Sequence, residues 1–158
     1  MSEVYLGNPN LKKANTEIEF TEEQIIEFLK CKEDPVYFAN NYIKIVSLDE
    51  GLTQFHPYDF QEKLIHNFHE NRFNICKMPR QTGKSTTVVS YLLHYAVFND
   101  SVNIGILANK AATARELLGR LQTAYENLPK WMQQGILSWN KGSMELENGS
   151  KILAASTS

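Results

Sequence analysis

The sequence predicts an α/β fold, in which a parallel β-sheet is flanked by helices and preceded by a small helical unit. Residues 72–79, RFNICKMP, have the composition of a short strand, and residues 84–98 follow as a largely apolar helix. Residues 102–108, VNIGILA, are a continuous apolar run, typical of a strand covered on both faces. A second helical pattern covers residues 109–128. Strand, helix, strand, helix is the order that builds a parallel sheet with right-handed crossovers.

The bulk composition fits one ordinary globular unit. The chain has 158 residues, of which 42% are hydrophobic and 22% charged, and this excludes a disordered or fibrous protein. The net charge of −2 is not that of a small basic domain that binds nucleic acid. Residues 1–50 carry 5 basic and 10 acidic side chains, or −5, whereas residues 51–158 carry 11 and 8, or +3. The second part therefore suits an anionic ligand.

The N-terminal third predicts an extended arm and two short helices. Residues 1–20 show little periodicity and are expected to form the arm. Thr21 and Gln24 have the spacing of a capping box, so a helix is expected to begin there and to end before Pro35. A second short helix is expected over residues 34–46, with proline in its first turn.

Three further elements follow from the pattern. A helix entered at Pro57 has an apolar stripe, with Gln61 on its polar side. Residues 130–135 are expected to form one short helical turn. Residues 143–156 alternate around an Asn-Gly pair, which is the strongest short signal for a β-hairpin.

The sequence predicts no metal cluster and no membrane segment. Cys31 and Cys76 lack metal-ligand spacing and are expected to be reduced thiols of a cytosolic protein. The N-terminus has no basic and apolar leader, and no stretch reaches the roughly 18 apolar residues of a membrane span. We therefore expect a soluble intracellular protein without membrane contact.

Residues 79–85, PRQTGKS, join the predicted strand to the helix that follows and end in the Gly-Lys-Ser of a phosphate-binding P-loop, or Walker A motif. In such a loop the free N–H groups and the positive dipole end of a helix face an anion. Gly83 would let the main chain approach phosphate, Lys84 would reach the β- and γ-phosphates, and Ser85 would ligate Mg²⁺. A purely structural loop is the alternative, but it leaves Lys84 unexplained.

The loop departs from the usual motif at its start. The first glycine of G-x-x-x-x-G-K-[ST] is replaced by Met78, which indicates a negative φ where a strand ends. Arg80 lies inside the loop, where it could stabilise charge developing at the γ-phosphate; alternatively it is a solvated loop cation. The main-chain N–H groups of Gln81, Thr82 and the residues after them would form the phosphate cradle, with Thr86 facing the α-phosphate.

Gln61 is the candidate for contact with a nucleotide base. Its amide offers both a donor and an acceptor to the edge of adenine, and Tyr58 or Phe55 could pack on the ring. The alternative is a solvated glutamine on a polar helix face, with the aromatic side chains in the core.

ATP hydrolysis would also need a carboxylate at the end of an apolar strand, to hold Mg²⁺ and orient water. The stretch YAVFND ends a helix, and Glu145 and Glu147 lie on the predicted hairpin. The sequence therefore shows no convincing acidic partner, the Walker B motif, for the loop.

Five stretches together resemble, in order and spacing, the N-terminal ATPase region of the large terminase subunit of tailed bacteriophages, in particular the T-even-like myovirus type. They are DPVYFANNYIKI, FHPYDFQEKLI, MPRQTGKSTT, IGILANKAATARELLGRL and SMELENGSKILAAS. The resemblance implies an incomplete RecA-like P-loop NTPase core. Residues 1–54 would be the arm and helical unit, and residues 55–158 the front part of the core. The Walker B motif and nuclease domain of the family would follow Ser158.

The resemblance also implies a function. It implies a molecular motor that hydrolyses ATP, with Mg²⁺, to translocate double-stranded DNA into the prohead in the host cytoplasm. Its partners would be the portal protein, the small terminase subunit and further copies in a ring. Arg80 and Lys84 would have catalytic roles, Gln61 and the loop from Arg80 to Thr86 would bind the nucleotide, and Ser85 would bind the metal.

Two other interpretations stay open. One is the first RecA-like lobe of a DNA helicase or translocase, which shares the order of glutamine and P-loop. The other is an assembly module that binds nucleotide without turnover.

Overall fold

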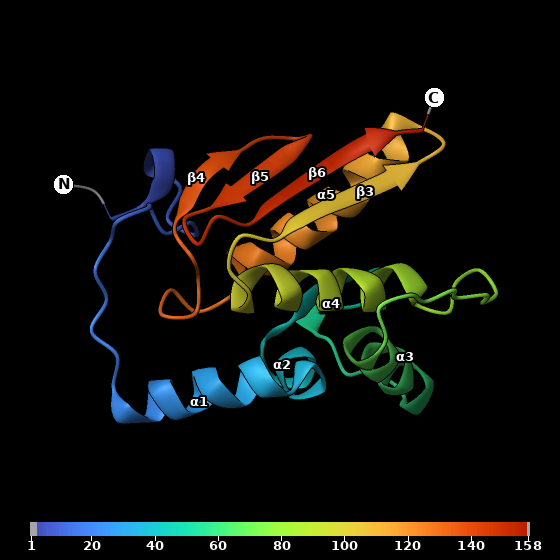
Figure 1. Ribbon diagram of the computed structural model, residues 1–158, viewed down its shortest axis with the longest axis horizontal. Helices are drawn as coiled ribbons and strands as arrows, with labels where there is room; N and C mark the ends of the chain where they lie inside the picture. Colours follow the sequence, from blue (N-terminus) through green and yellow to red (C-terminus); the bar gives the residue numbers. More distant parts are fainter. Residues whose placement is uncertain (1–2, 158) are drawn as a thin grey trace.

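The computed structural model describes residues 3–157 and has a mixed α/β architecture, as predicted (Figure 1). Its helices are α1 (Glu22–Glu33), α2 (Pro35–Tyr42), α3 (Asp59–Glu70), α4 (Lys84–Phe98) and α5 (Ala111–Glu126), with a short 3₁₀ turn, η1 (Tyr5–Gly7). Its strands are β1 (Lys44–Ser47), β2 (Gly51–Gln54), β3 (Asn103–Ala108), β4 (Ile136–Trp139), β5 (Ser143–Leu146) and β6 (Lys151–Ser156).

A four-stranded sheet runs in the order β3, β6, β5, β4. β3 and β6 are parallel, with Asn103 opposite Lys151, while β5 is antiparallel to both β6 and β4. α5 packs against β3 and β6, and α4 packs against α5, so that α4 lies between the sheet and the helices α1 to α3 (Figure 1).

The core confirms the apolar stripe predicted on α5. Four residues of the predicted stripe, Ala114, Leu118, Leu121 and Tyr125, are fully buried in this core. Because these side chains recur every three or four residues, one face of α5 packs against the sheet while its other face stays polar. The burial of this stripe holds α5, and with it α4, in a fixed position relative to β3.

β3 differs from its prediction in one respect. Ile104 and Ile106 are buried, but Leu107 is 66% exposed, so the strand is covered on one face and not on both. Within the described residues 3–157, β3 is also a terminal strand of the sheet and pairs only with β6.

The predicted strand at residues 72–79 is wrong: this segment is an extended loop in the structure. Phe73 and Ile75 are 82% and 99% exposed. A strand needs a neighbour for its main-chain N–H and C=O groups, and among residues 3–157 no strand pairs with this segment. The predicted crossover through α4 is therefore not formed. The parallel pair is β3 and β6, connected through α5, β4 and β5.

The N-terminal helices confirm two local signals. At α1, Thr21 N–H donates to Gln24 Oε1 at 3.1 Å and Gln24 N–H donates to Thr21 Oγ1 at 3.2 Å, which is the predicted capping box. At α2, the Asp34 carboxylate accepts from two main-chain N–H groups, and Pro35 is the first helical residue.

The second helix is shorter than predicted. It ends at Tyr42, and residues 44–54 form the antiparallel hairpin of β1 and β2. The β-branched Ile45 and Val46 favour a strand over a helix, and Gly51 supplies a positive φ of 71° after the turn.

The N-terminal arm is partly docked on the sheet. Leu11 is 1% exposed, Ile136 N–H donates to the Lys12 carbonyl at 2.9 Å, and Lys13 forms a parallel bridge with Ile136. The predicted division of the chain at residue 54 stays a prediction.

The C-terminal hairpin of β5 and β6 confirms the Asn-Gly signal, since Gly149 has a φ of 85°. The predicted short turn at residues 130–135 is present as a hydrogen-bonded turn at Pro129. β4 was not predicted. None of the helices in the described part of the chain is long and apolar enough to cross a membrane.

Candidate phosphate-binding site

The candidate site is the loop of residues 78–86 at the start of α4. Gly83 is the N-cap residue, with φ 72° and ψ 20°, and no side chain caps the helix. The first hydrogen bond of the helical i to i−4 pattern is donated by Thr87 N–H to the Gly83 carbonyl at 3.0 Å. The main-chain N–H groups of the first turn therefore have no intrahelical acceptor and are available to an anion.

The loop main chain has the shape of an anion-binding nest. Gln81 has a φ of 63° and Gly83 a φ of 72°, whereas Thr82 between them does not have a positive φ. Alternation of this kind points successive N–H groups into one concavity. The left-handed conformation costs a non-glycine residue such as Gln81 about 1–2 kcal/mol, and strain of this kind is concentrated at functional sites.

We call the hollow beside this loop the loop pocket. It has a volume of about 510 Å³ and is lined by residues 78–86 and by Arg120 of α5. Its cations are Arg80, Lys84 and Arg120, and no carboxylate of residues 3–157 lines it. The electrostatic environment therefore favours an anion with more than one negative charge.

The structure brings the predicted loop residues to one pocket. Arg80 is exposed at its rim, while Lys84, Ser85 and Thr86 are half-buried on the first turn of α4. Thr82 Oγ1 donates to the Pro79 carbonyl at 2.9 Å, which closes the loop internally. Arg120 was not predicted, because nothing in the sequence separates it from the other cations of the helix; only the packing of α5 beside α4 places it here.

Gln61 also reaches the loop, but its amide binds the main chain. Tyr58 N–H donates to Gln61 Oε1 at 2.8 Å, and Gln61 Nε2 donates to the Thr82 carbonyl at 3.2 Å. The side chain is 3% exposed. A Cβ on Gly83 would press against Gln61 Nε2, so the positive φ and this close approach both favour glycine here. Gln61 therefore braces the loop from the start of α3.

The aromatic side chains near Gln61 differ in access. Phe55 is 5% exposed and belongs to the core, whereas Tyr58 is 71% exposed. Tyr58 and Phe60 stack with their ring centroids 5.9 Å apart and their planes at 13°. They form an exposed aromatic pair beside the brace.

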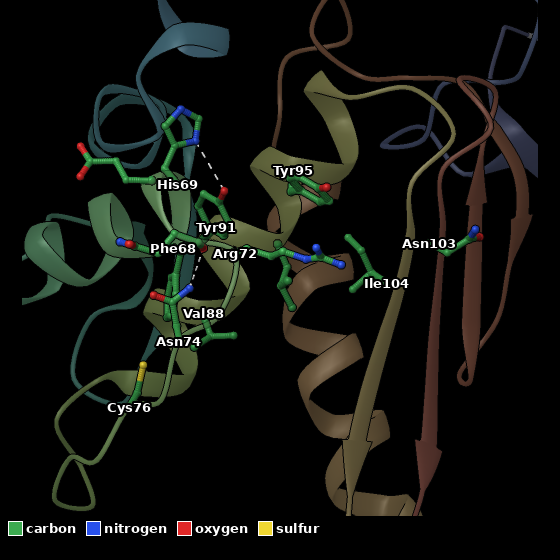
Figure 2. Close-up of a pocket in the computed structure, with 13 residues that line it drawn as sticks. Phe68, His69, Arg72, Asn74, Cys76, Val88, Tyr91, Tyr95, Asn103 and Ile104 are labelled. Atoms are coloured by element: carbon green, nitrogen blue, oxygen red, sulfur yellow. Dashed lines mark hydrogen bonds between the residues drawn. The ribbon is translucent and has the colours of Figure 1, made fainter.

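A second hollow lies farther along α4, and we call it the interlayer cavity. It has a volume of about 720 Å³ and lies between the 68–76 segment, α4 and β3. Figure 2 shows Arg72 extending into it from that segment toward Ile104 of β3. Tyr91 lies on its wall within 3.5 Å of His69 Nδ1, and burial raises the pKa of this tyrosine. None of the predicted site residues lines the interlayer cavity.

No preformed metal centre is found in the part of the chain that the structure describes. No group of three or more His, Cys, Asp or Glu side chains among residues 3–157 is placed to hold a metal ion. Cys31 is buried, and burial raises the pKa of its thiol to about 12, so it stays a neutral core residue. A cation in the loop pocket would depend on the Ser85 hydroxyl and on the oxygens of the ligand it accompanies.

The fold and the loop pocket define a mixed α/β protein with a cationic, backbone-lined site at a helix N-terminus. A family model described as terminase large subunit, T4likevirus-type, N-terminal, matches residues 75–158, which is 84 of the 158 residues. The chain therefore belongs to this family, as the sequence resemblance indicated, and has the role of a terminase large subunit in bacteriophage DNA packaging. The match includes the whole loop, α4, α5 and the four-stranded sheet. Gln61 lies outside it.

Proposed function

We propose that this chain is the N-terminal ATP-binding portion of a terminase large subunit, and that the loop pocket is a P-loop (Walker A) site for ATP with Mg²⁺. The observation that carries the proposal is a pocket with three cations, no carboxylate and the free N–H groups of a helix N-terminus. Polyphosphate is the common ligand that matches this combination of charge and main-chain donors.

Each residue of the loop takes a role from its chemistry. Lys84 would bind the β- and γ-phosphates, and the Ser85 hydroxyl would hold Mg²⁺, which would offset the negative charge of the phosphates. The main-chain N–H groups around Gln81, Thr82 and Gly83 cradle the phosphates, while Thr86 faces the α-phosphate. Arg80, exposed at the rim of the pocket, is free to move to the γ-phosphate and to stabilise charge there during hydrolysis.

We propose that the base stacks on the exposed Tyr58 and Phe60 pair. A contact between Gln61 and the adenine edge would require its amide to release Tyr58 N–H or the Thr82 carbonyl. Such an exchange would couple recognition of the base to the position of the loop, because Gln61 joins the two.

We also propose that the core is RecA-like. Two features support this. β3 and β6 are parallel and are covered by α5, and the candidate phosphate loop begins α4, which packs against α5.

ATP hydrolysis coupled to translocation of double-stranded DNA is proposed for the terminase large subunit that carries this chain. The motor would act as a ring docked on the portal, with the small terminase subunit, in the host cytoplasm. Hydrolysis needs a carboxylate near the loop. Among residues 3–157 no carboxylate lines the loop pocket. This observation favours a second candidate function for the chain alone, which is nucleotide binding without turnover. The family match favours terminase over helicase.

The test of nucleotide binding is calorimetric titration of the chain with ATP and Mg²⁺. We expect Lys84→Ala to raise the Kd about 10- to 100-fold, because it removes a charge-assisted contact to phosphate. Lys77→Ala is the matched control, since it removes the same charge just before the pocket and should leave the Kd unchanged. Equal affinity of Lys84→Ala and wild type would disprove the site.

The test of turnover uses the complete terminase large subunit. Lys84→Ala and Arg80→Ala are each expected to abolish most ATP hydrolysis, and Lys84→Ala to abolish DNA packaging with it. A subunit that hydrolyses ATP at the normal rate with Lys84→Ala would show that the catalytic site lies elsewhere.

A further inference from the structure

One side chain from outside the loop lines the loop pocket, and it is Arg120 of α5. It shares the pocket with Arg80 and Lys84, and among residues 3–157 no carboxylate lines it. Three cations around one hollow repel one another, and an anion bound between them would offset this repulsion. The position of Arg120 therefore suits a residue that binds an anionic ligand.

The present partner of Arg120 is held weakly. Its Nη2 donates to Glu116 Oε1 at 2.9 Å, one helical turn away, and the two side chains are 50% and 64% exposed. Exposed pairs at this spacing contribute little to stability. The remaining N–H donors of the guanidinium have no hydrogen-bond partner among residues 3–157. Glu116 also shares a shallow surface hollow with Arg115 and Lys141, so it keeps cationic neighbours if Arg120 leaves.

Arg120 lies on the Thr86 side of the loop pocket. Both residues also line a neighbouring hollow of about 650 Å³, which we call the hairpin groove, between the β1–β2 hairpin, α4 and α5. Of the residues that the structure describes, these two alone line both the loop pocket and the hairpin groove. Arg120 is thus next to the loop residue assigned to the α-phosphate, and Gln61 contacts the loop at Thr82 instead.

We propose that Arg120 leaves Glu116 and binds the α-phosphate of the nucleotide in the loop pocket. This inference rests on the proposed function of the loop. The planar guanidinium can donate two parallel hydrogen bonds to phosphate oxygens, which a lysine could not do. The α-phosphate is present in both ATP and ADP, so Arg120 contributes to the binding of both and holds the nucleotide after hydrolysis.

The experiment is calorimetric titration with ATP and, separately, with ADP. Arg120→Gln is expected to raise both Kd values about tenfold, the loss typical of one charge-assisted contact. Arg115→Gln removes the same charge from the same helix outside the loop pocket, and it should change neither Kd by more than about twofold. Glu116→Gln frees Arg120 and should lower both Kd values about twofold.

Several results would overturn the inference. Wild-type affinity of Arg120→Gln, together with lost binding in Lys84→Ala, would overturn the role of Arg120 and leave the loop site intact. If Arg120→Gln lost affinity for ATP but not for ADP, the assignment of Arg120 to the α-phosphate would be overturned. An equal loss of nucleotide affinity in Arg115→Gln would show that the effect comes from the net charge of the protein and not from a contact made by Arg120. Absence of nucleotide binding in the wild-type chain would overturn the loop site and Arg120 with it.

Discussion

Two hollows lie along the same helix, α4, and they differ in almost every property. The loop pocket, at the first turn, has about 510 Å³, three cations and main-chain donors at its floor. The interlayer cavity, beside residues 88–95, is larger, at about 720 Å³, and has aromatic walls with Arg72 and Glu70 of opposite charge. Only the smaller hollow combines charge of one sign with unpaired N–H groups.

The volume of a hollow is therefore a poor guide to the phosphate-binding site in this molecule. A cavity between sheet and helix layers arises wherever a neighbouring strand is missing from the packing, whatever the ligand. A nest of main-chain N–H groups requires positive φ at defined positions, and such strain is retained where it has a role.

The largest expected effect is of acid on His94, a buried neighbour of Tyr91, which lines the interlayer cavity. His94 is 2% exposed and stacks on Tyr91. Its Nε2–H donates to the Cys31 carbonyl at 2.7 Å, because a carbonyl oxygen can only accept. Burial lowers its pKa from 6.5 to about 4. Between pH 6.5 and pH 4, His94 therefore binds a proton in the unfolded chain but not in the folded chain. The free energy of unfolding decreases as the pH is lowered through this range.

We expect the free energy of unfolding to decrease by about 2 kcal/mol between pH 7 and pH 5, measured by urea denaturation. His94→Gln should be less stable at pH 7 but should lose most of this pH dependence. An unchanged slope in His94→Gln would assign the acid sensitivity to other groups.

The next effect is at Gly83. Gly83→Ala forces a side chain into φ 72° and against Gln61 Nε2, so we expect a loss of about 1–2 kcal/mol in thermal or urea unfolding, and weaker ATP binding. Gly105→Ala is the control, because a Cβ there meets nothing within 4 Å and the φ is not positive. If Gly83→Ala bound ATP as tightly as wild type, the nest would not be needed.

A smaller effect is expected at the brace. Gln61→Ala leaves Tyr58 N–H and the Thr82 carbonyl without their partner and should cost about 1 kcal/mol, with a lower affinity for ATP. Gln24→Ala removes the same capping contact at α1, where the glutamine bonds no loop. The loss of unfolding free energy in Gln61→Ala, minus the loss in Gln24→Ala, measures the contribution of the contact between Gln61 and the loop. Equal losses in the two variants would mean that Gln61 is only a cap.

The smallest effect is expected in the interlayer cavity. Arg72→Gln should leave the Kd for ATP within about twofold of wild type, since Arg72 is remote from the loop pocket and its charge is screened by solvent. A tenfold loss in this variant would instead place nucleotide phosphates in the larger cavity.

The sequence was sufficient for elements with strong local signals. The bounds of α4 follow from the loop and its apolar run, α1 from its capping box, and the β5–β6 hairpin from Asn-Gly. The short strands β1 and β4, of four residues each, were missed because their stability comes from pairing and not from local pattern. The same reason explains the false strand at 72–79: its composition fits a strand, but a strand forms only beside a partner.

The residues of the candidate site also divide into those that the sequence predicts and those that only tertiary packing brings together. The loop from Arg80 to Thr86 is contiguous in sequence and could be predicted. Gln61 could be placed near the loop, but its bonds to Tyr58 and Thr82 depend on how α3 meets α4. Arg120 is separated from the loop by a helix and a strand, so only tertiary packing brings it there.

The docked arm has a consequence for assembly. β4 is a terminal strand, and open strand edges invite pairing between molecules. Residues 12–14 cover this edge: Lys12 lies 3.8 Å from Glu147, its carbonyl binds Ile136 N–H, and a side chain on Gly135 would collide with Ala14. Residues 12–14 therefore guard this edge against pairing between molecules, so that the arm opposes edge-to-edge aggregation.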